Sequence, residues 1–128
     1  MKNILILNIC NRHDFYGHDV EVIEETWAKD IIDNVYPNIS YYSCCGMTPE
    51  MVYQTEHKSL GIIDEECHSI FLPINECQVN TYDFFLMLMK TINPKIYNTD
   101  YIMFVTPDVY VNVPLLNDFI QNIINPND

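Results

Sequence analysis

The chain has 128 residues, enough for one domain with a real hydrophobic core, so we expect a single domain over residues 1–128. Its 18 acidic side chains stand against six scattered bases, and the formal net charge of −12 excludes a nucleic-acid backbone as a partner. Because bases are scarce, a phosphate-bearing ligand would need a divalent cation or helix N-termini to offset its charge.

The cysteines indicate the compartment in which the chain works. There are five, an odd number, and they form no CxxC pair. This pattern disfavours a disulfide framework and a structural zinc site, and it predicts free thiols in a reducing, cytoplasmic compartment. The abundance of Ile and Asn is typical of AT-rich genomes, those of viruses included.

The first predicted element is a strand from Ile4 to Cys10. Its apolar run is too short to span a membrane, and no small-residue cleavage site follows it, so we expect neither a membrane span nor a signal peptide. The polar, glycine-containing residues 11–18 are expected to form a loop at the carboxyl end of this strand.

A helix is predicted next, with Asp19 as its cap and its end near Asn34. The following strand runs from Ile39 to Cys45 and is rich in aromatic and β-branched residues. One face of the helix carries an apolar stripe made of Val20, Ile23, Trp27 and Ile31. We expect this stripe, including the single tryptophan, to pack in the core.

The periodic pattern weakens over residues 46–66, which we interpret as an insertion or lid. A third strand is predicted from His68 to Ile74. An apolar helix then runs from Tyr82 to Ile92, capped by Asn80 or Thr81, and is expected to stop at Asn93-Pro94.

The last predicted strand, Tyr101–Val105, is apolar without interruption, which is typical of a strand covered on both faces. Asp108 follows at its carboxyl end, where open α/β sheets bind ligands. Asn112 then opens a final helix with Pro114 in its first turn, ending at Ile124. The order of elements predicts an α/β domain with a mostly parallel, doubly wound sheet flanked by helices.

Three blocks of this chain, in the same order, resemble blocks of GT-A glycosyltransferases of the β-1,3-galactosyltransferase and Fringe-like group. The segment Thr106-Pro-Asp-Val-Tyr-Val-Asn112 is similar to their metal-binding motif of acids followed by Val-Phe-Val-Asn. The segment Ile23-Glu-Glu-Thr-Trp-Ala-Lys29 resembles their Ile-Arg-x-Thr-Trp helix, and Asn80–Ile92 resembles the helix before the metal strand. The resemblance implies a Rossmann-like fold of GT-A type.

The resemblance also implies a function. A nucleotide-sugar, with a UDP-sugar as the expected donor, would lie over the carboxyl ends of the strands and transfer its sugar to an acceptor hydroxyl. Asp108 would be the ligand of Mn²⁺ or Mg²⁺ bridging the diphosphate, with the Thr106 hydroxyl beside it. Asn8, Asn11 and Arg12 would face the uridine and ribose, although Arg12 fits an exposed loop cation equally well.

The chain departs from the family at several positions. Thr106 and Pro107 stand where the family has acids, and Glu24 stands where it has a basic residue. The sequence ends at Asp128, so we expect only the nucleotide-binding half, truncated before the acceptor-binding half. No residue of this chain can therefore be named as the general base that deprotonates an acceptor.

Two alternatives remain open. The first is a catalytically degenerate GT-A-like domain that serves as an interaction or oligomerisation module. The helical run Phe84–Met89 is apolar almost all round, so it is either buried or a contact surface for a second copy. The second, weaker alternative is a flavodoxin-like or receiver-like domain, which the single acid Asp14 in the first loop disfavours.

Overall fold

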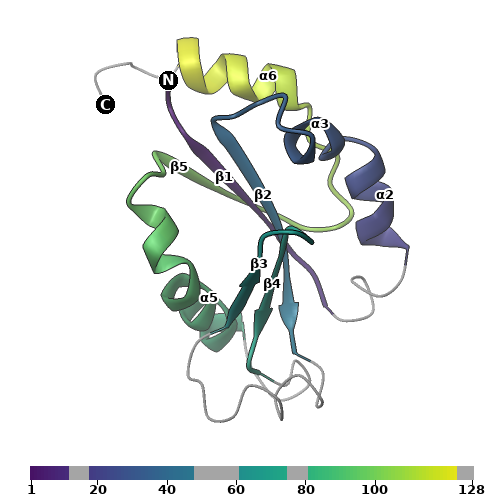
Figure 1. Ribbon diagram of the computed structural model, residues 1–128, viewed down its shortest axis with the longest axis vertical. Helices are drawn as coiled ribbons and strands as arrows, with labels where there is room; N and C mark the ends of the chain where they lie inside the picture. The colour runs from purple at the N-terminus through teal and green to yellow at the C-terminus, as the bar shows by residue number, and fades with distance from the viewer. Residues whose placement is uncertain (12–17, 48–60, 75–80, 124–128) are drawn as a thin grey trace.

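A twisted five-stranded sheet forms the centre of the protein (Figure 1). The structure is a computed structural model and describes residues 1–11, 18–47, 61–74 and 81–123. In spatial order β3-β4-β2-β1-β5, all neighbouring pairs are parallel except β3 with β4. The expected α/β fold with a mostly parallel sheet is confirmed. The strands are β1 (Ile4–Ile9), β2 (Ile39–Gly46), β3 (Ile62–Asp64), β4 (Ser69–Leu72) and β5 (Tyr101–Val105).

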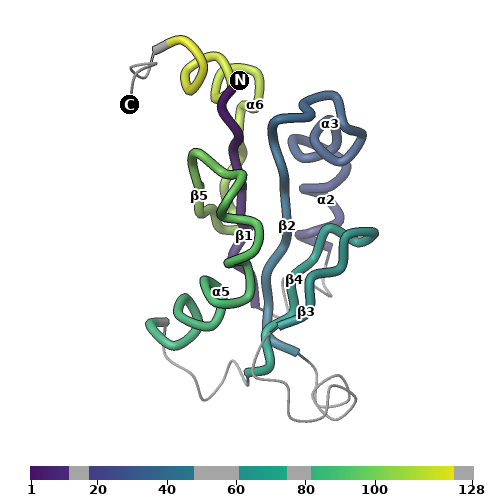
Figure 2. The backbone as a smooth tube through the Cα atoms, turned by 60° about the vertical axis from the view of Figure 1, so that its left-hand side comes forward, coloured from purple at the N-terminus to yellow at the C-terminus, as the bar shows by residue number. Residues whose placement is uncertain are grey.

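Helices cover both faces of the sheet (Figure 2). One face carries α2 (Asp19–Glu25), α3 (Lys29–Ile32), α6 (Val113–Asp118) and the π-helical turn η1 (Phe119–Ile123). The other face carries α5 (Thr81–Ile96). None of the helices in the described segments has the length and apolar character needed to span a bilayer.

The apolar run Ile4–Leu7 of β1 is explained by helices on both faces of the sheet. Its residues alternate between the faces, so Ile4 and Ile6 pack under α2 and α3 while Leu5 and Leu7 pack under α5. Ile6 and Leu7 are fully buried, as expected for a strand covered on both sides.

The helix predicted from Asp19 to Asn34 is wrong in its continuity and in its cap. The chain breaks it at Thr26, whose hydroxyl donates to the Val22 carbonyl oxygen at 2.6 Å and competes with the helical hydrogen-bond pattern. Asp19 is the first helical residue rather than the cap, and His18 precedes it without a side-chain cap bond. The apolar stripe Val20, Ile23, Trp27 and Ile31 is nevertheless buried, as predicted.

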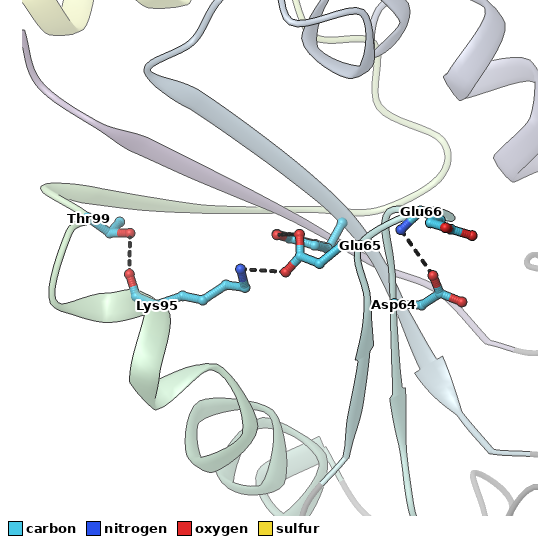
Figure 3. Close-up of polar contacts among 6 residues, drawn as sticks. Asp64, Glu65, Glu66, Lys95 and Thr99 are labelled. Carbon is cyan, nitrogen blue, oxygen red and sulfur yellow. Dashed lines mark hydrogen bonds and ion pairs between the residues drawn. The ribbon is translucent and has the colours of Figure 1, made fainter.

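Helix α5 continues past the predicted stop at Asn93-Pro94 and ends at Ile96. Contacts beyond the proline hold this last turn in place (Figure 3). Lys95 forms an ion pair with Glu65 at 2.5 Å, and the Thr99 hydroxyl donates to the Lys95 carbonyl oxygen at 2.9 Å. These contacts offset the main-chain hydrogen bond that proline removes.

Glu65 lies in the turn between β3 and β4, a turn that the sequence did not resolve within the predicted insertion at 46–66. Asp64 Oδ1 accepts main-chain bonds from Glu66 and Cys67, both at 3.1 Å. Partial burial opposes ionisation of Glu65, but hydrogen bonds from Lys95 and from the Tyr42 hydroxyl hold its pKa below the ordinary value. Residues 48–60, the middle of the predicted insertion, lie outside the described part of the chain.

The expectation that Tyr101–Val105 is covered on both faces is wrong for part of the strand. β5 borders the sheet, and the Phe104 side chain is 45% exposed. Its apolar sequence is therefore only partly explained by packing within the described residues.

Candidate functional site

Three of the predicted site residues, Asn11, Thr106 and Asp108, follow the carboxyl ends of two neighbouring strands. β1 and β5 are parallel, and Asn8 pairs with Val105. Asn11 and the segment Thr106–Asp108 therefore leave the sheet at the same end. β2 and β5 lie on opposite sides of β1 in the sheet. The connection from β1 to β2 runs through α2 and α3 on one face, and the connection from β4 to β5 runs through α5 on the other face. Such a change of direction is where open α/β sheets bind ligands.

Asp108 lies in a tight turn directly after β5. Its carboxylate accepts a hydrogen bond from the Thr106 hydroxyl, and Val109 N–H donates to the Thr106 carbonyl oxygen at 3.1 Å. The Thr106 hydroxyl, together with the main-chain N–H of Asp108, holds the pKa of Asp108 below its ordinary value. Asp108 is therefore an exposed, ionised carboxylate whose orientation is set by its own turn.

The segment after Asp108 is anchored in the core at Val111 and Val113. Val111 and Val113 are buried in the core beneath α2, α3 and α6. Between them, Asn112 Oδ1 accepts the Leu115 N–H at 3.1 Å and caps α6, with Pro114 in the first turn. The predicted helix start at Asn112 is confirmed. The anchoring fixes the connection between Asp108 and the body of the protein.

Asn8 points into the core instead of toward solvent. Its side chain is fully buried, and Nδ2 donates to the Tyr41 hydroxyl at 3.1 Å. The Tyr41 hydroxyl in turn lies 2.7 Å from Ser43 Oγ. Asn8 Oδ1 has no hydrogen-bond partner among the described residues.

Tyr41 and Ser43 are polar residues that the sequence reasoning missed. Burial raises the pKa of Tyr41 to about 12, so the phenol stays neutral and acts as a hydrogen-bond donor and acceptor. Trp27 packs edge-on against Tyr41, with ring centroids 5.3 Å apart, and within the described segments its Nε1 also lacks a partner. The alternation of Tyr41 and Ser43 along β2, opposite Asn8, was the available signal.

The other predicted residues divide into three groups. Asn11 is exposed just beyond β1, and Thr106 is exposed with its hydroxyl committed to Asp108. Arg12 lies outside the described residues. Glu24 stays on α2, where partial burial raises its pKa and the nearby His68 opposes that rise. The structure thus brings Asn11, Thr106 and Asp108 to one end of the sheet and separates Asn8 from them by burial.

The oxygen atoms at the carboxyl end of β1 and β5 suit a metal ion that is bound together with a phosphate-bearing ligand. In the described part of the chain, no group of three acid, histidine or cysteine side chains is placed to hold an ion. One carboxylate cannot supply a full protein site, but Mg²⁺ and similar ions are commonly held by one or two carboxylates together with substrate phosphates and water. Asp108 fits that second arrangement.

A second hollow lies at the opposite, amino end of the parallel strands. It measures about 360 Å³ and its lining is mostly polar, from Asn3, Asn38, Ser40, Asn98 and Thr99. Lys95 also lines it, although its ammonium group is held by Glu65. This hollow provides a contrasting location against which a ligand site near Asp108 can be tested.

Comparison of the chain with protein-family models, with curated proteins and with solved structures finds no match.

Proposed function

We propose that this chain binds a nucleoside-diphosphate sugar, with a UDP-sugar as the first candidate, together with Mn²⁺ or Mg²⁺. The binding site would be the carboxyl end of β1 and β5. The bound nucleotide-sugar would be the donor in the transfer of a sugar to an acceptor hydroxyl. The observation that carries the proposal is the convergence of Asn11, Thr106 and the ionised Asp108 at the point where the chain changes direction across the sheet.

The charge of the chain supports a cation-dependent site. With a net charge of −12 and few bases, the protein repels a free diphosphate at long range. A divalent cation held by the Asp108 carboxylate would offset the diphosphate charge and, when bound, would stabilise the charge that develops on the leaving diphosphate. Thr106 would keep the Asp108 carboxylate ionised and oriented. The core Asn8–Tyr41–Ser43 network would support β1 and β2 beneath the nucleotide.

The alternative proposal is a GT-A-like domain that has lost turnover and serves for interaction or oligomerisation. The observation that favours it is that, within the described residues, Asp108 belongs to no group of three acid, histidine or cysteine side chains that could hold a metal ion. The Phe84–Met89 surface proposed for such contacts is largely turned to the sheet. Leu88 is fully buried, whereas Leu86 is 42% exposed.

A thermal titration separates ligand binding from its absence. UDP at about 100 times its dissociation constant, in the presence of Mn²⁺, is expected to raise the free energy of unfolding by about 2.7 kcal/mol, because it binds only the native state. The shift is measured by differential scanning fluorimetry or calorimetry. UDP alone and Mn²⁺ alone are expected to give much smaller shifts, since the metal site is complete only with the diphosphate.

One outcome would contradict nucleotide binding, and another would support the non-catalytic alternative. A melting temperature that does not move with UDP and Mn²⁺ together, up to millimolar concentrations, would contradict nucleotide binding. Binding of a UDP-hexose without release of UDP in the presence of simple sugar acceptors would support the non-catalytic alternative.

A further inference from the structure

The two borders of the sheet differ in how well they are protected. β3 is short and ends in Asp64, and two further acids, Glu65 and Glu66, follow it directly. β5 is longer, and Tyr101–Val105 contains no charge and no proline. Exposed edge strands pair with other strands unless charge, proline, a bulge or shortness prevents it. β5 carries none of these devices, and it lies at the border of the sheet in both views (Figures 1 and 2).

The hydrogen bonds to β1 show which groups face outward. Tyr101 N–H donates to the Asn3 carbonyl oxygen at 3.1 Å, so the main-chain groups of Tyr101, Met103 and Val105 face β1. Main-chain groups alternate in direction along a strand. Those of Ile102 and Phe104 therefore face away from the sheet, where no described strand pairs with them.

Apolar surface flanks this border on both faces. On the α6 side, a groove of about 410 Å³ is lined by Met103, Val109, Val111, Leu115, Leu116 and Phe119. On the α5 side, the half-exposed Phe104 packs edge-on against Phe85, with ring centroids 5.2 Å apart. A strand that docks here would therefore meet apolar side chains on both of its faces. Its own side chains must be apolar at consecutive positions.

We infer that the occupant of this border is β5 of a second copy of the chain, paired antiparallel about a two-fold axis at Met103. β5 itself meets the requirement, since all of its side chains are uncharged and apolar or aromatic. Ile102 exchanges main-chain hydrogen bonds with the partner's Phe104, and Phe104 does so with the partner's Ile102. Met103 then lies opposite the partner's Met103 in the closely spaced, non-hydrogen-bonded pair.

Charge also fits this arrangement. Each copy carries a net charge of −12, so two copies repel each other least along a strand such as β5, which itself contains no acid. Antiparallel pairing places the acid-containing turn 106–108 of one copy toward the Tyr101 end of the other. Lys2 lies at that end, with its ammonium group 5.4 Å from the Tyr101 ring centroid. Asp100 lies at the same end, where its carboxylate accepts the Asn3 N–H at 2.7 Å. Lys2 therefore offsets part of the charge of Asp100 in its own copy together with part of that of the other copy's Asp108.

A cysteine cross-link tests the axis directly. Met103→Cys, made in a Cys67→Ser, Cys77→Ser background, is expected to give a disulfide-linked dimer under mild oxidation. The two Cβ atoms of such a facing pair lie about 4.5–5.5 Å apart, close to the separation that a disulfide bridges. Val22→Cys in the same background is the matched control, because Val22 is 53% exposed on α2, away from β5. Equal cross-linking at positions 22 and 103, or none at 103, would overturn the inference.

Light scattering gives a second, independent test on the chain without added cysteines. At sub-millimolar concentration the wild type is expected to have twice the 15.1 kDa mass of one chain. Phe104→Lys, which adds a charge at the border, is expected to halve the measured mass, whereas Val22→Lys leaves it doubled. Circular dichroism establishes that both variants fold. A wild type that scatters as a monomer, or a folded Phe104→Lys chain that stays dimeric, contradicts the inference. If Phe104→Lys does not fold, the cross-link decides.

Discussion

Replacing Ile6 with alanine is expected to lower the free energy of unfolding by about 2–5 kcal/mol, the usual cost of truncating a fully buried isoleucine. Ile6 has no exposed surface and lies at the centre of β1, in the cluster that joins the sheet to α2, α3 and α6. The chain cannot close the cavity easily, because β1 is paired on both sides with β2 and β5. Urea denaturation followed by circular dichroism measures the change.

Val22→Ala is the matched control for this loss. Val22 is 53% exposed on the outer side of α2, so its truncation is expected to change stability by less than about 0.5 kcal/mol. Equal effects at positions 6 and 22 would contradict the central place of β1. That central place matters for function, since β1 contributes one side of the proposed ligand site.

Replacing Asp108 with asparagine is expected to weaken binding of UDP with Mn²⁺ by about 10- to 100-fold. The substitution keeps the size of the side chain but removes the negative charge. Interactions of this charge-assisted kind are worth about 1.5–3 kcal/mol, which corresponds to that range of affinity. Isothermal titration calorimetry with UDP at fixed Mn²⁺ gives the two dissociation constants. Stability should change little, because Asp108 is exposed.

Asp30→Asn is the control for the loss of one negative charge. Asp30 is an exposed acid on α3, remote in sequence from the β5 turn. Its substitution changes the net charge by the same amount and is expected to leave the dissociation constant within about twofold, the effect of long-range charge alone. A similar weakening in both variants would assign the effect to net charge instead of to a ligand at Asp108.

The sequence predicted the sheet well because the strands are rich in apolar, aromatic and β-branched residues. Ile4 to Cys10, Ile39 to Cys45 and Tyr101 to Val105 each coincide with an observed strand to within one residue. The antiparallel β3 was not predicted, since Ile62–Asp64 is too short to show a period. Its pairing depends on β4, which is a contact that periodicity does not report.

Helix ends were predicted less well, because tertiary contacts decide them. Propensity rules stop α5 before Pro94, yet the Lys95–Glu65 ion pair and the Thr99 bond carry the helix on to Ile96. In the first helix, the Thr26 hydroxyl competes with the main chain and breaks the predicted span. Thr26 and Val22 are four residues apart, so that contact is local, whereas the partner of Lys95 is Glu65, thirty residues earlier in the chain, which helical spacing does not indicate.

The candidate site was predictable in its position and less so in its details. The order of the elements places Asp108 at the carboxyl end of the last strand, and the structure has it directly after β5. Burial of Asn8 follows from its place on the same face of β1 as Ile4 and Ile6. Its hydrogen bond with Tyr41 depends on the order of the strands, which the local sequence does not contain. The contact between Thr106 and Asp108 depends on the turn geometry.

Paramagnetic relaxation by Mn²⁺ tests the proposed location of the ligand most directly. In amide spectra of the isotopically labelled chain, Mn²⁺ added with UDP is expected to broaden the signals of Asn11, Thr106 and Asp108 first, while Mg²⁺ with UDP shifts the same signals without broadening them. Broadening centred on Asn3, Asn98 and Thr99, which line the hollow at the other end of the sheet, or no selective broadening, would contradict a metal-diphosphate site at Asp108.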